Sequence, residues 1–146
     1  MNSEQIELVR TSFAKVAPIA DQAATMFYEE LFERDPSLRG LFPEDMAEQR
    51  RKLMTMLGMA VNGLNDWDGL RRIVADLGAR HAGYGVKPEY YPTVGAALLA
   101  TLSLGLGEDF TTEVKQAWSS VYAALSGAMI EAAEAATTSD RLAIAE

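Results

Sequence analysis

The sequence predicts an all-α fold with six or seven helices. Its apolar residues recur at spacings of three and four rather than two, which is the period of one helix face. Proline, glycine and helix-capping residues divide the chain into segments of helical length with short joints. Because 146 residues can bury a sizeable core, we expect a single domain over residues 1–146, with a mobile tail over about 136–146.

Each expected helix has a start or stop signal. Ser3 is expected to cap the first helix, and Pro18 ends it because proline disfavours helical geometry in the preceding residue. Asp35 caps a short turn that begins with proline, a capping box over 45–48 opens the next helix, and Thr111 caps the last. In order, the expected helical segments are 3–17, 19–34, 36–41, 46–63, 70–82, 88–106 and 112–135.

Composition and charge exclude several classes of function. A net charge of −8 and a pI near 4.7 argue against binding to nucleic acid or to an anionic membrane surface. The chain has no cysteine, which excludes disulfides, thiolate catalysis and cysteine-ligated metals. The first residues show no signal peptide, and the most apolar stretch, 93–107, is too short and too mixed to span a bilayer. We expect a cytoplasmic protein.

The only histidine lies on the apolar face of a predicted helix. Leu70, Ile73, Leu77, His81 and Tyr84 follow helical spacing, so the imidazole is aimed at a core. It is then either a hydrogen-bonded core residue or a ligand. One histidine without cysteine is a poor zinc site. Haem, however, needs only one strong axial ligand from the chain and a large apolar slot, which an all-α chain of this size can supply.

Two polar side chains are predicted on inward faces of other helices. Tyr28 lies one turn from Ala24 and Phe32, so its hydroxyl needs a partner, and a backbone carbonyl is the simplest one. Gln49 shares a face with Leu53; it either faces the interior or serves the helix N-terminus. Phe42, at the chain corner, would by itself be a core residue.

The order of these residues resembles that of the globins, and more closely the bacterial single-domain globins and the globin domain of flavohaemoglobins. The resemblance covers roughly residues 3–133. The local sequences that carry it lie at 27–28, 41–42, 49–53, 81, 86–91, 94–95, 98–99 and 117–122.

The resemblance implies a globin fold that encloses a pocket for haem b, with His81 as the proximal iron ligand. Tyr28 and Gln49 would be the distal polar pair, Leu53 the apolar distal residue, and Phe42 would pack flat on the porphyrin. The other cofactor-lining residues that it implies are Leu77, Val86, Tyr91 and Leu98.

The resemblance also implies a proximal relay, in which a tyrosine matching Tyr91 works with a glutamate that bonds the proximal histidine. Here Ala133 stands where that glutamate would fall, with Glu131 and Glu134 on other faces of the helix. The sequence therefore leaves the relay, and any strongly peroxidase-like character, in question.

Other residues have two interpretations each. Met54, Met56 and Met59 either fill gaps in the core or offer a sixth axial ligand. The cations on the same segments either meet the haem propionates or are surface charges: Lys52, Arg80 and Lys87.

Three functions compete. The first is reversible binding of O₂, with NO and CO as further gas ligands. The second is a nitric oxide dioxygenase, which would need a separate reductase because 146 residues leave no room for a flavin-binding part. The third is a haem-free helical interaction module. Either a monomer or a homodimer fits the sequence.

Overall fold

The computed structural model describes the backbone of residues 1–145 and the side chains of residues 1–136. This part of the chain contains no β-strand, which confirms the all-α prediction. Three 3-10 helices join the longer helices: η1 (Ala17–Ile19), η2 (Pro36–Leu41) and η3 (Gly107–Asp109). The α-helices are α1 (Ser3–Val16), α2 (Ala20–Arg34), α3 (Ala47–Asn62), α4 (Trp67–Gly83), α5 (Tyr90–Leu106) and α6 (Thr112–Ala145).

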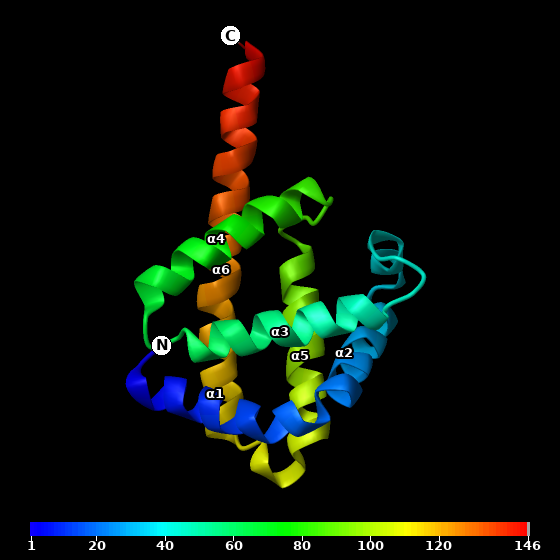
Figure 1. Ribbon diagram of the computed structural model, residues 1–146, viewed down its shortest axis with the longest axis vertical. Helices are drawn as coiled ribbons and strands as arrows, with labels where there is room; N and C mark the ends of the chain where they lie inside the picture. Colours follow the sequence, from blue (N-terminus) through cyan, green and yellow to red (C-terminus); the bar gives the residue numbers. More distant parts are fainter. Residues whose placement is uncertain (146) are drawn as a thin grey trace.

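The helices pack in two groups, one around α6 and the other around α2. Figure 1 shows α6 along the long axis of the molecule with α4 crossing it, while α3 crosses α5 and reaches α2. The main contacts join α4 and α1 to α6, and α2 to α5 and α3. Between α1 and α6 the indole of Trp118 donates to the Ser12 hydroxyl at 2.8 Å, so both buried polar groups are paired.

In the described residues, no helix combines the length and hydropathy of a membrane span.

Most helix boundaries lie within two or three residues of the prediction, but two caps differ from it. Asn2, not Ser3, caps α1, and its side chain forms a reciprocal capping box with Gln5. The predicted box over 45–48 does not form. Met46 is the N-cap of α3, and Asp45 accepts from the Ala47 amide at 3.0 Å, because it lies one residue too early to cap the helix.

The last helix is longer than predicted. Its expected end was near Ala135, whereas α6 continues to Ala145. A run of alanines with few breakers explains the extension, since alanine is the best helix former. The side chains of 137–146 lie outside the described residues, so the mobile tail over about 136–146 stays a prediction.

A glycine lets α4 approach the backbone of α6. A Cβ on Gly78 would meet the carbonyl oxygen of Met129 and lie 2.5 Å from its Cα. Leu70 and Val74 precede Gly78 at one-turn intervals, and all three are buried. The prediction of the buried face of α4 is therefore wrong in part, because α6 packs on the neighbouring face that carries Gly78. Ile73, which was predicted to face the core, is 47% exposed.

We expect Gly78→Ala to lower the free energy of unfolding by about 1–3 kcal/mol, because the added methyl group meets backbone that cannot rotate away. Gly127→Ala is the matched control: it lies in α6 with nothing near its Cβ position, so the gain in helix propensity should leave stability equal or higher. Urea unfolding of both variants tests this. A Gly78→Ala variant as stable as the parent would show that the close crossing is not a constraint.

Candidate functional site

His81 lies in the last turn of α4 and is half-buried rather than enclosed in the core. Its Nδ1 is 2.6 Å from the Leu77 carbonyl oxygen. A carbonyl can only accept, so Nδ1 carries a proton, and in the neutral ring the lone pair is then on Nε2. Within the described residues Nε2 has no hydrogen-bond partner. The imidazole is therefore oriented by its own helix and has a free ligating nitrogen.

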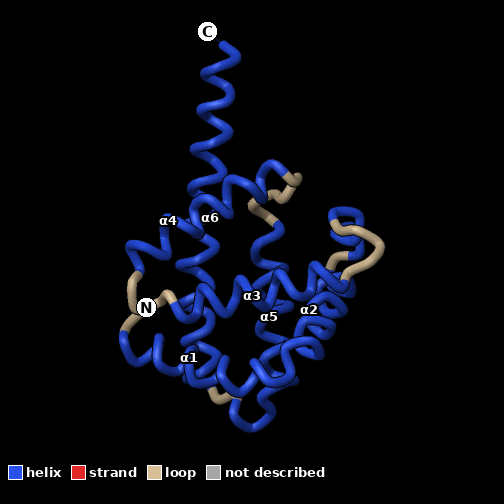
Figure 2. Tube along the Cα trace, viewed as in Figure 1, coloured by secondary structure: helices blue, strands red, loops and turns tan. Residues whose placement is uncertain are grey.

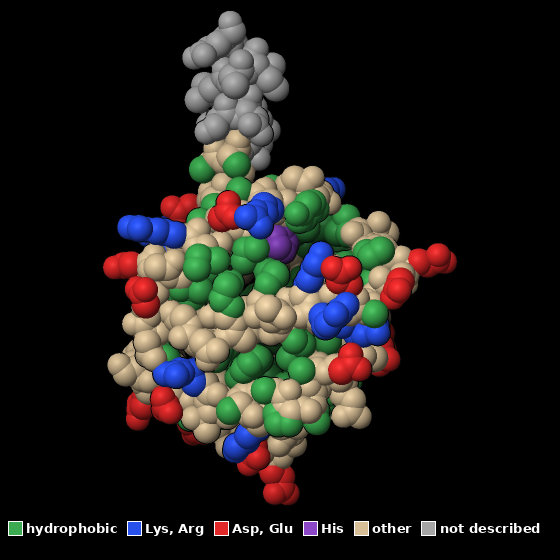
Figure 3. Space-filling model, viewed as in Figure 1, with side chains coloured by type: hydrophobic (Ala, Val, Ile, Leu, Met, Phe, Trp, Pro, Cys, Tyr) green, Lys and Arg blue, Asp and Glu red, His purple; other side chains and the backbone are tan. Residues whose placement is uncertain are grey.

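Large apolar side chains are exposed on the elements that flank His81. They include Leu41 at the end of η2, Ile73 on α4, and Tyr84, which is 68% exposed and whose ring centroid lies 6.1 Å from that of His81. Figure 3 shows His81 in purple on a face where green apolar side chains gather above α3. Clustered exposed apolar groups of this kind are typical of a ligand or partner site.

Tyr28 and Gln49 meet across the helices α2 and α3. The Gln49 amide nitrogen donates to the Tyr28 hydroxyl oxygen at 3.1 Å. Tyr28 is only 6% exposed, and burial raises its pKa above the usual value, although the bond from Gln49 lowers it. Because the oxygen accepts from Gln49, the phenolic O–H remains available to donate elsewhere. A buried tyrosine and a half-buried glutamine thus form one donor group, called the buried donor group below after its hydroxyl.

Phe42 belongs to an aromatic cluster around Tyr28. Its ring lies 5.4 Å from that of Tyr28 and 5.6 Å from that of Phe32, both in edge-on geometry. Phe27 approaches the other edge of Tyr28 at 5.0 Å. Such ring pairs add to the stabilisation from burial, and here three rings contact Tyr28: those of Phe27, Phe32 and Phe42.

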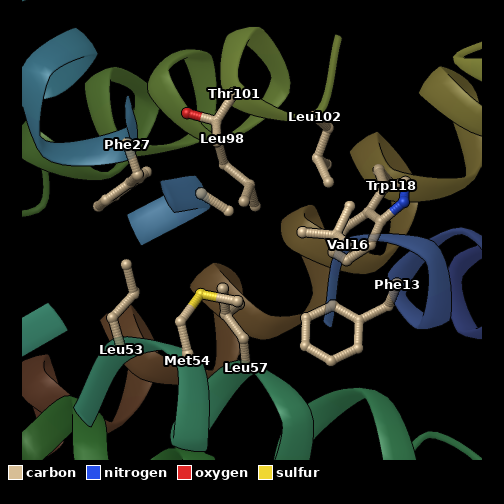
Figure 4. A pocket seen from close by; sticks show the side chains of 11 residues that line it. Phe13, Val16, Phe27, Leu53, Met54, Leu57, Leu98, Thr101, Leu102 and Trp118 are labelled. Atoms are coloured by element: carbon tan, nitrogen blue, oxygen red, sulfur yellow. The ribbon is translucent and has the colours of Figure 1, made fainter. Parts of the chain in front are cut away.

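Leu53 and Leu98 line an apolar cavity of about 20 Å³, shown in Figure 4. Its two polar side chains are already used: Thr101 donates to the Ala97 carbonyl at 2.8 Å, and Trp118 donates to Ser12. A cavity without a free polar group does not hold water well. Its lining comes from α1, α2, α3, α5 and α6: Phe13, Val16, Ala23, Phe27, Leu53, Met54, Leu57, Leu98, Thr101, Leu102 and Trp118.

The segment after α4 is tied back to the histidine. The Val86 amide donates to the His81 carbonyl at 3.1 Å, in a turn where Gly85 adopts a φ of +89°. Glycine adopts this backbone conformation without strain, whereas other residues do so at a cost. The turn therefore places Val86 beside the last turn of α4.

Tyr91 is buried at the start of α5 but forms no hydrogen bond with His81 in the described residues. Its carbonyl accepts from the Tyr122 hydroxyl at 2.5 Å. Gly95 makes room for that ring, because a Cβ there would lie 2.6 Å from it. The predicted relay position, Ala133, has no carboxylate, and Glu131 pairs with Arg71 at 3.5 Å.

The cations named from the sequence lie at the surface. Arg80 pairs with Asp76 at 2.6 Å, and Lys52 is 4.0 Å from Glu48. Lys87 is exposed in the loop after α4. Exposed pairs of this kind contribute little to stability.

Sequence reasoning missed Arg39. Its guanidinium donates to three carbonyl oxygens of the loop that follows η2, and it lies over the ring of Phe32. The sequence holds no clear signal for this role, because the acceptors are backbone carbonyls.

The donor set of this site fits haem better than a bare metal ion. One oriented imidazole with a free Nε2 supplies a single strong ligand, which is what haem requires. The exposed apolar side chains beside it would be covered by a porphyrin, and the Tyr28 hydroxyl offers a donor on another element.

Comparison with known proteins gives a consistent result. The family model described as Globin matches residues 25–129. Neuroglobin of Tetraodon nigroviridis is 29% identical over 143 residues, covering 88% of this chain and 90% of that protein. The flavohemoprotein of Bacillus subtilis (strain 168) is 26% identical over 133 residues, covering 89% of this chain but 33% of that protein. An engineered carbene transferase from Rhodothermus marinus, which carries the name of a nitric oxide dioxygenase, superposes with a TM-score of 0.83 at 25% identity, covering 100% and 99% of the two chains.

The Tyr122 hydroxyl, which bonds to the Tyr91 carbonyl of α5, predicts a pH effect on stability. Burial raises the pKa of Tyr122, so the folded chain keeps that proton at pH values where the unfolded chain loses it. The folded state then binds more protons, and stability falls as the pH rises above about 10. We expect Tyr122→Phe to lower the free energy of unfolding by about 1 kcal/mol at neutral pH, because the hydrogen bond is lost. Between neutral pH and about pH 11, the free energy of unfolding should fall less in the variant than in the parent.

Urea unfolding at neutral and alkaline pH measures both effects. Tyr84→Phe is the matched control, because Tyr84 is 68% exposed and its replacement should leave the alkaline slope unchanged. Equal alkaline losses in Tyr122→Phe and the parent would contradict the assignment.

Proposed function

The chain belongs to the globin family, and from this we propose that it binds haem b through His81 and binds O₂ reversibly beside Tyr28 and Gln49. The observation that carries the proposal is the bond from Gln49 to the Tyr28 hydroxyl, which leaves a buried O–H free to donate. We propose CO and NO as further gas ligands, in a cytoplasmic monomer or homodimer.

His81 would hold the haem through Nε2, since Nδ1 is engaged with Leu77. Haem supplies an iron centre that binds diatomic gases. Phe42 would pack on one side of the porphyrin, and Leu53 would keep water from the gas site. The other side chains proposed to line the cofactor are Leu77, Val86, Tyr91 and Leu98.

Tyr28 would stabilise a bound gas that carries partial negative charge. Its O–H is aimed by the Gln49 bond and the aromatic cluster, so little ordering remains when a ligand arrives. Burial raises the pKa of Tyr28, so the hydroxyl stays protonated at neutral pH. A hydrogen bond to a charged acceptor is worth about 1.5–3 kcal/mol, and O₂ gains more from it than the less polar CO.

A second proposal is nitric oxide dioxygenase activity with a separate reductase. It is supported by the similarity to a flavohemoprotein and to a structure named for that activity. The similarity to the flavohemoprotein spans 33% of that protein, and the proposal names the reductase as a separate partner. Repeated NO consumption by the oxygenated protein with a flavin reductase and NADH distinguishes this enzyme from a simple O₂ carrier.

We expect His81→Ala to lose the haem, because no second strong ligand replaces the imidazole in the described residues. The measurement is Soret absorbance per protein after purification and after titration with haem. Added imidazole should restore part of the absorbance by occupying the vacated position. If the alanine variant keeps full pigment and gas uptake without imidazole, the proposed ligand is wrong. A parent protein that takes up no haem would instead favour the haem-free interaction module.

We expect Tyr28→Phe to release O₂ about 10 to 100 times faster than the parent, because it loses the donated hydrogen bond. CO release should change much less. Stopped-flow measurement of both rates tests this, with the CO release rate of each protein as the internal control. Equal O₂ rates in Tyr28→Phe and the parent would exclude Tyr28 from this role.

A further inference from the structure

The loop between η2 and α3 has no regular backbone hydrogen bonding, yet one side chain binds three of its carbonyl groups. Arg39 Nη1 donates to the Phe42 oxygen at 3.2 Å and to the Pro43 oxygen at 2.9 Å, and Nη2 donates to the Glu44 oxygen at 3.1 Å. Figure 2 shows this segment in tan beside the first turn of α3. Successive carbonyls that would otherwise face water thus converge on one guanidinium.

Arg39 also binds the backbone amide of Phe42 through its own carbonyl group. The Phe42 amide donates to the Arg39 carbonyl at 3.2 Å, so both backbone polar groups of Phe42 bond to a single residue. The guanidinium carbon lies 5.5 Å from the centre of the Phe32 ring. Because Phe32 and Phe42 both contact the Tyr28 ring, Arg39 is connected to the buried donor group through two aromatic neighbours.

The same loop leads directly into the helix that carries Gln49. Glu44, whose carbonyl Arg39 binds, lies three residues before the start of α3 at Ala47. The N-cap of that helix, Met46, offers no side-chain cap. The position of the first turn of α3 therefore depends on how the preceding loop is held.

We propose that Arg39 is a positioning residue that fixes Phe42 and the start of α3, and thereby aims the Tyr28–Gln49 pair. This inference rests on the proposed gas-binding function. Its chemical basis is the guanidinium fork, which presents donors in a fixed plane to several acceptors, whereas a lysine ammonium is a single point charge on a flexible stem.

The test separates geometry from charge by replacing Arg39 with lysine. Arg39→Lys keeps the positive charge but cannot hold three carbonyls in one plane. Arg34→Lys is the matched control, since Arg34 lies five residues earlier in the chain and its guanidinium pairs with Glu30 at 3.6 Å instead of binding the loop. In the haem-free protein we expect hydrogen exchange over residues 42–53 to be about tenfold faster in Arg39→Lys and unchanged in Arg34→Lys.

In the haem-loaded protein we expect O₂ to dissociate about threefold to tenfold faster from Arg39→Lys, with CO release little changed. Two results would overturn the proposal. If Arg39→Lys exchanges like the parent, the Arg39 contacts do not hold the loop. If it exchanges faster but releases O₂ at the parent rate, the loop does not position the gas site. Failure of the parent to take up haem would overturn the gas-binding function on which the inference rests, and it would be recognised before any variant is compared.

Discussion

The backbone contact between α4 and α6 at Gly78 is the constraint on which the site depends. A helix that touches its neighbour through a glycine cannot rotate or retreat without losing that contact. The buried line from Leu70 through Val74 to Gly78 is committed to α6, and the neighbouring face is left for His81. The imidazole therefore lies less than one turn beyond a fixed point, on a face that the protein covers only in part.

The Tyr28–Gln49 pair is held by side chains instead of by a close backbone contact. A buried tyrosine hydroxyl without a partner would cost about 1–3 kcal/mol, and Gln49 removes that cost. The aromatic rings around Tyr28 restrict it further, and Arg39 ties their loop together. Substitutions can change this side without disturbing the α4–α6 crossing. On the proposed function, substitutions at this pair would change gas affinity without altering the α4–α6 backbone contact.

Residue spacing and helix-breaking residues predict the helices and the residues that lie on them. Helical spacing placed His81, Tyr28 and Gln49 on their helices, and Pro18 ended α1 as expected. The predicted face of α4 was wrong at Ile73, because the burial of that face depends on where α6 crosses, which is a long-range contact. Arg39 escaped notice for a related reason, since its three acceptors are backbone carbonyls that no residue type reveals.

The hydrogen bond at Nδ1 bears on the choice between gas binding and peroxidase-like chemistry. A carboxylate at that position would make the imidazole a stronger electron donor to a bound metal, which favours cleavage of an O–O bond. In the described residues His81 Nδ1 bonds instead to the neutral Leu77 carbonyl, while Glu131 pairs with Arg71. A neutral acceptor orients the ring without raising its donor strength to the same extent. This arrangement would favour ligand binding and release at the proposed haem over bond cleavage.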